Sequence, residues 1–294
     1  MSARLPTLAA ATAAVLVFAG GTAGVAGAAE TVALPASACQ AERLFSSGFD
    51  RTAVQGSGGS GGLVSADLDR VVSVAGLGAR SYLLHLPPSY DPTQPMPLLV
   101  ALHGAAGSPA LADPVARALR LHWSPVADAG GFMLLVPVAS GSSGGWSPGR
   151  DGAWLAAALD DVAAAYAVDT SRRLLWGFSA GAHWGYALAL GNPELFAGFG
   201  AHAGALQAYA CDSSGAPECA ELLQQVQPQL PIAIRVGNGD PLRTHAVADR
   251  SRLLSAGWSS PGSLDYAQFS GGHTYAEPHL AEAWSHLCRA AVLP

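Results

Sequence analysis

Short apolar runs alternate with longer amphipathic stretches along most of the chain. The runs at 97–102, 133–138, 174–176, 196–203, 232–236 and 264–269 have the length and composition of buried β-strands. Apolar residues recur with helical spacing at 110–129, 152–166, 180–190, 244–256 and 277–292, and a break is expected near Pro125. Strands that alternate with helices predict an α/β fold with a mostly parallel central sheet and helices on both faces.

Two features flank this pattern. Residues 71–77 and 80–86 are β-type runs separated by Gly78, which predicts a hairpin at the edge of the sheet. Residues 204–231 lack a clear period and form a long connection. The alternating pattern from 65 to 294 therefore predicts one large α/β domain.

The N-terminus has the organisation of a secretory signal peptide. Arg4 precedes an uncharged apolar run at 8–19, and Ala26-Gly27-Ala28 follows as an A-x-A cleavage site. The apolar run breaks at Gly20, short of the roughly 20 residues that a membrane span needs. We therefore expect residues 1–28 to be removed and the protein to be secreted, extracellular or periplasmic, without a membrane anchor. Residues 29–64 are predicted to form an irregular, Gly/Ser-rich segment.

Charge and composition narrow the range of partners. The net charge is −6 and no basic cluster occurs, which argues against nucleic acids and anionic membrane surfaces as partners. All 15 basic residues are arginine, so no lysine is present to act as a base or to form a Schiff base. No His/Cys cluster has the spacing of metal ligands, so neither a metal nor another cofactor is expected. The protein is expected to be a monomer.

Four cysteines follow the signal peptide, an even number for an oxidising compartment, and two disulfides are expected. Cys211 and Cys219 are close enough in sequence to close a small loop, which leaves Cys39 and Cys288 to join the N-terminal segment to the last helix. Three pairings are possible, and the sequence does not choose among them.

The stretch Gly177-Phe178-Ser179-Ala180-Gly181 follows the apolar run at 174–176 and fits a G-x-S-x-G nucleophile turn between a strand and a helix. A serine must project from such a tight turn for a histidine to reach it. Side chains two residues before and after the serine would clash with the neighbouring strand and helix, and glycine removes them. A chance match is the alternative in a chain with 35 glycines.

Two further loops supply partners for Ser179. Asp240 follows the run at 232–236, and His273 follows the run at 264–269. We expect His273 to be the general base and Asp240 to fix its tautomer, while the backbone N–H groups of Ala105 and Ala180 form an oxyanion hole. Asp240 could instead be a turn or capping aspartate, and His273 a polar residue in a glycine turn.

Other polar residues are weaker candidates. His183 and His202 precede the predicted acid, and Asp160 and Asp161 fall within a predicted helix. The rival histidines are His183, His202, His245 and His279, and the rival acids are Asp160, Asp161 and Asp265. His103, in the sequence HGAAG, is expected among the substrate-binding residues, with support of its own loop as the alternative.

Several motifs together resemble a known family. They are YLLHLPPSY at 82–90, PLLVALHGAAG at 97–107, Trp146, the Asp160-Asp161 pair, the GFSAG turn, Phe196-Ala197 and Gly271-Gly272-His273. From about residue 80 to 289 the chain resembles secreted polyhydroxybutyrate depolymerase-like esterases, which are related to feruloyl and acetylxylan esterases. The resemblance implies an α/β-hydrolase fold, a triad of Ser179, Asp240 and His273 in that order, and Trp146 near an acyl pocket. Tyr275 stands where the family often has tryptophan.

The sequence therefore predicts a secreted serine esterase that forms an acyl-enzyme. A polyhydroxyalkanoate-type polyester or its oligomers is the first substrate expected, and a feruloyl or acetylxylan ester is the alternative. A non-catalytic binding protein on the same fold is the alternative from another class, and loss of a triad residue would favour it. A serine peptidase of this fold is a third possibility.

Overall fold

The computed structural model describes residues 66–208, 223–226 and 229–292. These residues all belong to one of the two units into which the chain divides, Val32–Pro294. The predicted signal peptide, the segment 29–64 and the cysteines Cys39, Cys211 and Cys219 lie outside the described residues.

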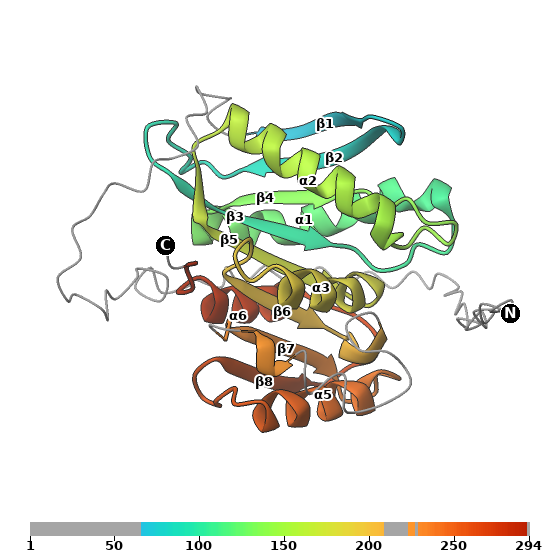
Figure 1. Ribbon diagram of the computed structural model, residues 1–294, viewed down its shortest axis with the longest axis vertical. Coiled ribbons are helices and arrows are strands. Elements are labelled where there is room, and N and C mark those ends of the chain that lie inside the picture. Colours follow the sequence, from blue (N-terminus) through green and yellow to red (C-terminus); the bar gives the residue numbers. More distant parts are fainter. Residues whose placement is uncertain (1–65, 209–222, 227–228, 293–294) are drawn as a thin grey trace, which may run out of the picture. The chain divides into compact units, whose positions relative to one another are not determined.

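An eight-stranded sheet forms the centre of the described fold, with the strand order β1-β2-β4-β3-β5-β6-β7-β8 (Figure 1). The β1–β2 hairpin is antiparallel and pairs antiparallel with β4, and the other pairs are parallel. The strands are β1 (Ala66–Val74), β2 (Gly78–Leu86), β3 (Met96–Leu102), β4 (Met133–Pro137), β5 (Val168–Phe178), β6 (Gly198–His202), β7 (Ile232–Gly237) and β8 (Leu264–Phe269). The predicted hairpin and the mostly parallel sheet are confirmed.

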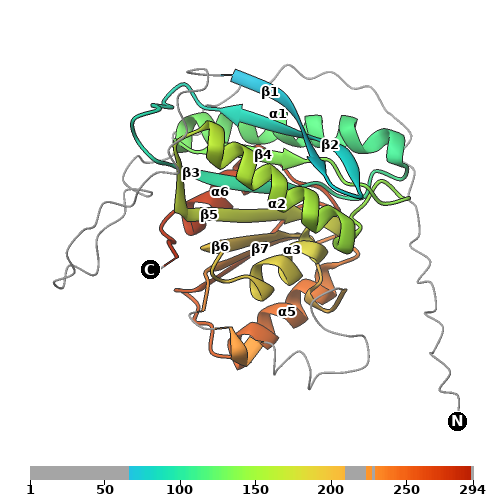
Figure 2. The ribbon, with the colours of Figure 1, turned by 45° about the horizontal axis from the view of Figure 1, so that its top comes forward.

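Helices cover both faces of this sheet, as predicted. Helices α2 and α3 lie on one face, and α1 and α6 pack against each other on the opposite face (Figure 2). The helices are α1 (Ala112–Gly130), α2 (Pro148–Ala165), α3 (Ala180–Gly191), α5 (Arg243–Ser255) and α6 (Glu277–Leu287), with short 3₁₀ turns η1 (Pro109–Leu111) and η2 (Leu206–Ala208).

Alternation along the central strands divides the core between these two faces. On β3, Leu98 and Val100 pack in the cluster under α2 and α3, whereas Leu99 and Ala101 pack in the cluster under α1 and α6. All four side chains are fully buried. Strands buried on both faces read as continuous apolar runs, which explains why these strands were visible in the sequence.

The break predicted near Pro125 is wrong, because α1 continues through this proline. A proline inside a helix removes one backbone hydrogen bond and crowds the carbonyl four residues earlier, here that of Leu121. Leu121 lies on the solvent side and is exposed. Trp123 before the proline and Val126 after it are buried against the sheet, so packing on both sides keeps the helix continuous.

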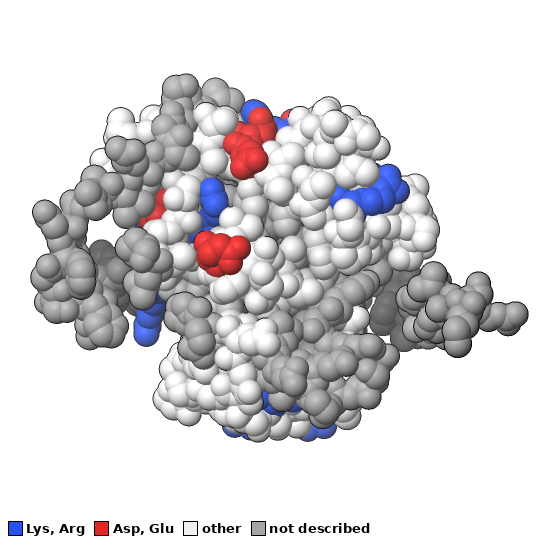
Figure 3. All heavy atoms as spheres, in the orientation of Figure 1, with Lys and Arg blue, Asp and Glu red and all other residues white. Residues whose placement is uncertain are grey.

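The described surface shows no concentration of charge in the view of Figure 3, where Arg, Asp and Glu side chains lie singly or in small groups among uncharged residues. Among the described residues, no helix combines the length and apolar character needed to cross a membrane.

Candidate active site

Four loops that carry predicted site residues leave the carboxyl ends of parallel strands. His103 and Ala105 follow β3, Ser179 follows β5, Asp240 follows β7 and His273 follows β8. Carboxyl ends of parallel strands share one edge of a sheet, so the four loops meet there although they are far apart in sequence.

Ser179 occupies a strained turn between β5 and α3. Its backbone has φ 52° and ψ −118°, a left-handed conformation that is uncommon for a residue with a side chain. A Cβ atom on Gly177 would lie 2.4 Å from the carbonyl oxygen of Gly181, and one on Gly181 would lie 2.3 Å from the carbonyl oxygen of Leu102. The steric need for glycine on each side of Ser179 is therefore confirmed.

Ser179, His273 and Asp240 form one hydrogen-bonded chain. Nε2 of His273 lies 2.8 Å from Oγ of Ser179, and Nδ1 lies 2.9 Å from Oδ2 of Asp240. Because a carboxylate can only accept, Nδ1–H of His273 donates to Asp240, which leaves Nε2 free to accept the serine proton. The structure thus brings together the three side chains that the sequence placed on three separate loops.

The carboxylate of Asp240 has two functions in this arrangement. Its side chain is fully buried, and its Oδ1 accepts a hydrogen bond of 2.7 Å from the backbone N–H of Leu242 at the start of α5. Its Oδ2 faces His273. Asp240 can therefore cap α5 through Oδ1 and face His273 through Oδ2. The capping alternative and the proposed catalytic position are compatible.

The backbone N–H groups of Ala105 and Ala180 have no acceptor among the described residues. Ala180 is the first residue of α3, where N–H groups have no partner within the helix and the helix dipole favours negative charge. Ala106 donates to the carbonyl of Gly144 at 3.1 Å, which fixes the loop containing Ala105. Both amides are available for a developing oxyanion.

His103 is buried at the start of this loop. Only 1% of its surface is exposed. Its Nδ1 donates to the carbonyl of Gly104 at 2.7 Å, and its Nε2 accepts the backbone N–H of Ala139 at 3.1 Å. Burial lowers the pKa of the ring and keeps it neutral, as these two bonds require. These bonds support the loop, as the alternative for His103 expected, and its contact with substrate stays a prediction.

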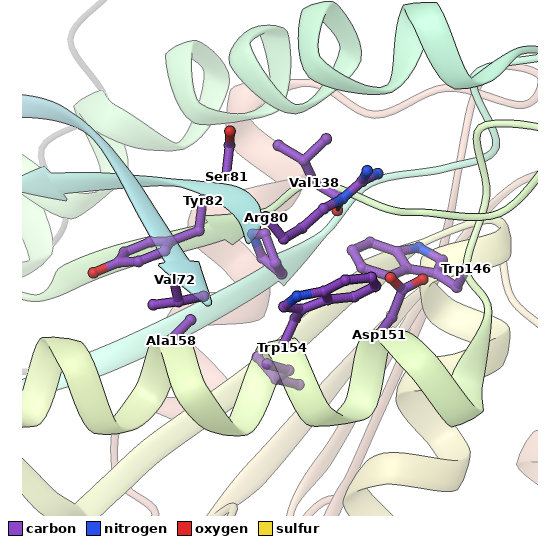
Figure 4. A pocket seen from close by; sticks show the side chains of 11 residues that line it. Val72, Arg80, Ser81, Tyr82, Val138, Trp146, Asp151, Trp154 and Ala158 are labelled. Carbon is purple, nitrogen blue, oxygen red and sulfur yellow. Dashed lines mark hydrogen bonds between the residues drawn. The ribbon is translucent and has the colours of Figure 1, made fainter. Parts of the chain in front are cut away.

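Trp146 supports the same loop through a hydrogen bond and ring stacking. Its indole N–H donates to the carbonyl of His103 at 2.8 Å, and its ring stacks on Trp184 of α3 with 4.9 Å between ring centroids. Figure 4 shows Trp146 at one end of a pocket beneath α2, beside Asp151 and Trp154. Ser179 does not line this pocket. A contact between Trp146 and an acyl group stays a prediction.

The rival residues have other partners. Nδ1 of His183 accepts the backbone N–H of Ala205, Nε2 of His202 donates to the carbonyl of Thr274, and the ring of His279 stacks on Phe269; His245 lies on α5. Among the acids, Asp161 pairs with Arg70 and Asp265 with Arg235, while Asp160 is exposed on α2. None of these carboxylates is bonded to His273.

Two residues near the site were not recognised from the sequence. Asp151 is buried in α2, and its carboxylate accepts the N–H groups of Ser140 and Ser147, which shapes the loop carrying Trp146. The chain order disfavours His202 as the catalytic histidine, because it precedes the predicted acid. The predicted strand 196–203 includes His202, and in the structure β6 ends at this residue.

Two observations concern metals and disulfides. Within the described ranges, no group of three or more His, Cys, Asp or Glu residues is arranged to hold a metal ion. Cys288 is disulfide-bonded, and its partner lies outside the described residues. The pairings Cys211–Cys219 and Cys39–Cys288 stay predictions.

Comparison with known proteins finds a family that resembles part of the chain. The profile of the family described as "Esterase PHB depolymerase" matches residues 80–218. This range includes Ser179 and both candidate oxyanion amides. Over these residues the chain is similar to this esterase family. The fold expected from the sequence is thereby confirmed.

Curated relatives carry esterase names. A bifunctional acetylxylan esterase/xylanase of Neocallimastix patriciarum is 31% identical over 109 residues, covering 36% of this chain and 15% of the relative. Feruloyl esterase C of Emericella nidulans is 29% identical over 144 residues, covering 48% of this chain and 52% of the relative. The chain thus spans about half or less of the length of these relatives.

A solved structure supports the fold of this chain independently. A ferulic acid esterase superposes with a TM-score of 0.60 at 19% identity, covering 76% of this chain and 98% of the other. At this identity the likeness concerns the fold alone.

Proposed function

We propose that this protein is a secreted serine esterase that hydrolyses carboxylic esters through Ser179, His273 and Asp240. The observation that carries the proposal is the continuous line from Ser179 Oγ through His273 to the buried Asp240, with both hydrogen bonds below 3 Å. The esterase names of the curated relatives support the same reaction class.

The first half of the proposed reaction acylates Ser179. Nε2 of His273 takes the hydroxyl proton as Oγ attacks the ester carbonyl carbon, and the N–H groups of Ala105 and Ala180 stabilise the oxyanion. Asp240 stabilises the resulting imidazolium through Nδ1–H. When the tetrahedral intermediate collapses, the bond to the alcohol oxygen breaks, and His273 donates its proton to the departing alcohol.

The second half releases the acid. A water molecule takes the place of the alcohol, His273 accepts one of its protons, and the hydroxide oxygen attacks the acyl carbon. Collapse of this intermediate returns the proton to Oγ of Ser179 and frees the carboxylic acid. One ester and one water are thus converted into one alcohol and one acid, and the protein returns to its starting state.

Feruloyl or acetyl esters of plant cell-wall type are the substrates that we propose. Both curated relatives are named for such esters, which gives this class more support than the polyester expected first. The family description, with its reference to polyhydroxybutyrate, keeps short hydroxybutyrate oligomers as the second candidate. We also propose that the protein is a monomer and that it acts without a nucleic-acid, membrane or cofactor partner.

The experiment that tests this proposal is a substrate panel on the purified mature protein. Methyl ferulate, acetylated xylan, p-nitrophenyl acetate and hydroxybutyrate oligomers would be compared, with Ser179→Ala as the control for every substrate. We expect hydrolysis of the acetyl or feruloyl esters and loss of that activity in the control. Hydrolysis of none of the panel, or equal hydrolysis by the control, would overturn the proposal.

A further inference from the structure

His202 connects the nucleophile to the catalytic-histidine loop. It is the last residue of β6 and pairs in register with Phe178 of β5, the residue before Ser179. Its backbone carbonyl accepts the N–H of Ser179 at 2.9 Å. Its ring Nε2 lies 3.0 Å from the carbonyl oxygen of Thr274, the residue after His273. One residue therefore contacts both loops, through its main chain on one side and its side chain on the other.

The protonation of His202 follows from its surroundings. A carbonyl oxygen only accepts, so Nε2 carries the proton and donates to Thr274. The side chain is fully buried, and burial lowers its pKa to about 3, so the ring is neutral at neutral pH. Nδ1 has no hydrogen-bond partner among the described residues. Burying a polar ring with one unpaired nitrogen costs free energy of folding. The bond from Nε2–H to Thr274 is the hydrogen bond that this ring makes among the described residues.

The His273 loop is fastened on its other side by the Asp240 loop. The carbonyl of Gly271 accepts the N–H of Gly239 at 2.8 Å, and the N–H of Gly271 lies 3.3 Å from Oδ1 of Asn238. These bonds hold the chain two residues before His273. The bond from His202 holds it one residue after His273, so the backbone of His273 is restrained on both sides.

We propose that His202 is a positioning residue that sets the distance between Ser179 and His273 through its Nε2–H bond to Thr274. This inference rests on the proposed esterase function. Proton transfer requires His273 to stay within hydrogen-bond reach of Ser179, and a displacement of about 1 Å in a reacting pair can cost about 100-fold in rate. His202 does not touch the reacting atoms, so its effect should appear in turnover rather than in substrate binding.

Two amide substitutions distinguish the two ring nitrogens. The side-chain nitrogen of glutamine can reach the position of Nε2, whereas that of asparagine reaches only about as far as Nδ1. His202→Gln therefore preserves the bond to Thr274, and His202→Asn removes it. Both variants are uncharged, polar and smaller than the wild-type ring, so they are matched in chemistry and differ in reach.

The experiment measures kcat, KM and the thermal midpoint of both variants and the wild type on p-nitrophenyl acetate. We expect His202→Gln to keep at least about a third of the wild-type kcat. We expect His202→Asn to lose about 10- to 100-fold in kcat, with KM changed by less than about threefold. The thermal midpoints of the two variants should be similar. Rescue by glutamine at matched stability is a result that a merely structural role would not produce.

Other outcomes would overturn the inference. Equal kcat values for the two variants, or losses that follow the thermal midpoint, would remove the positioning role. Failure of the proposed function looks different, because then the wild type would hydrolyse no ester or Ser179→Ala would match it. An active wild type with an inactive Ser179→Ala and indistinguishable His202 variants would leave the proposed function intact and reject only the role of His202.

Discussion

Nε2 of His273 lies 2.8 Å from Oγ of Ser179, although the two residues are 94 positions apart in the chain. Nothing local holds these atoms together, because Ser179 belongs to the turn after β5 and His273 to the loop after β8. The contact depends on the sheet register between these strands and on the loops that end them. Changes in those loops should therefore lower activity even where they leave the reacting side chains intact.

Asp240→Asn should lower kcat by about 10³- to 10⁴-fold at neutral pH and leave KM almost unchanged. The asparagine amide can donate its N–H to Nδ1 of His273. This bond favours the tautomer that carries its proton on Nε2, and a protonated Nε2 cannot accept the proton of Ser179. Steady-state kinetics on one soluble ester would measure the effect.

Asp160→Asn is the matched control for Asp240, because Asp160 is exposed on α2 and has no bond to His273. It should keep most of the wild-type activity. If Asp240→Asn turned over normally while Asp160→Asn, Asp161→Asn or Asp265→Asn was inactive, Asp240 would not be the catalytic acid.

Gly181→Ala should destabilise the protein and abolish ester hydrolysis. The added Cβ would lie 2.3 Å from the carbonyl oxygen of Leu102 and 2.7 Å from that of His103, and these backbone atoms belong to β3 and the oxyanion loop. Overpacking of this kind costs about 1–3 kcal/mol in the free energy of unfolding. Urea unfolding and an esterase assay would be run together.

Gly191→Ala, at the end of the same helix, is the control for Gly181. No atom lies within 4 Å of the Cβ that it would add. It should be neutral, or stabilising by up to about 1 kcal/mol because alanine favours helix. Similar unfolding free energies for the two variants would show that the crowding at the nucleophile turn has been overestimated.

The stability of the protein should fall as the pH drops below about 6.5, and His202 should contribute to this fall. Its pKa is 6.5 in an unfolded reference and about 3 in the folded protein, so between these values the unfolded state binds more protons. The free energy of unfolding then rises with pH by about 1.4 kcal/mol per pH unit for one such group, and the contribution is complete above pH 6.5.

His202→Gln should remove this contribution. Between about pH 4 and 6, the slope of the unfolding free energy against pH should fall by the equivalent of about one bound proton. Arg235, His273 and His279 face His202 and further disfavour its charge. Urea unfolding at several pH values would measure the slope for both proteins. An unchanged slope in the variant would mean that His202 is not a buried neutral group.

Peptide mapping without reduction should find Cys211 joined to Cys219 and Cys39 joined to Cys288. Cys288 is disulfide-bonded, and closure of the short loop between Cys211 and Cys219 should contribute on the order of 2 kcal/mol to stability. A peptide joining Cys288 to Cys211 or Cys219 would reject this connectivity.

Much of the fold could be predicted because its signals are local. The buried strands β3, β4 and β7 appear as continuous apolar runs, and the two glycines around Ser179 report a steric requirement within five residues. Asp240 and His273 could be nominated because each follows a predicted strand. Their contact could not be derived, since it depends on which strands are neighbours in the sheet.

The features that the local sequence does not reveal depend on tertiary packing. The helix passes through Pro125 because Trp123 and Val126 are buried on the sheet, which the local preference of proline does not reveal. His103 has the motif position of a substrate-binding residue, yet both ring nitrogens are bonded to backbone groups. The position of His202 depends on β6 lying between β5 and β7, which the sequence around it does not reveal.

Covalent labelling of Ser179 tests the central claim most directly. The purified protein would be treated with a fluorophosphonate, digested and mapped by mass spectrometry, with Ser179→Ala and His273→Gln treated in parallel. We predict one adduct, on Ser179, and a loss of ester hydrolysis in proportion to labelling. The rate of labelling should fall steeply in His273→Gln, and Ser179→Ala should form no adduct. An adduct on a different serine, or full ester hydrolysis by Ser179→Ala, would contradict the account.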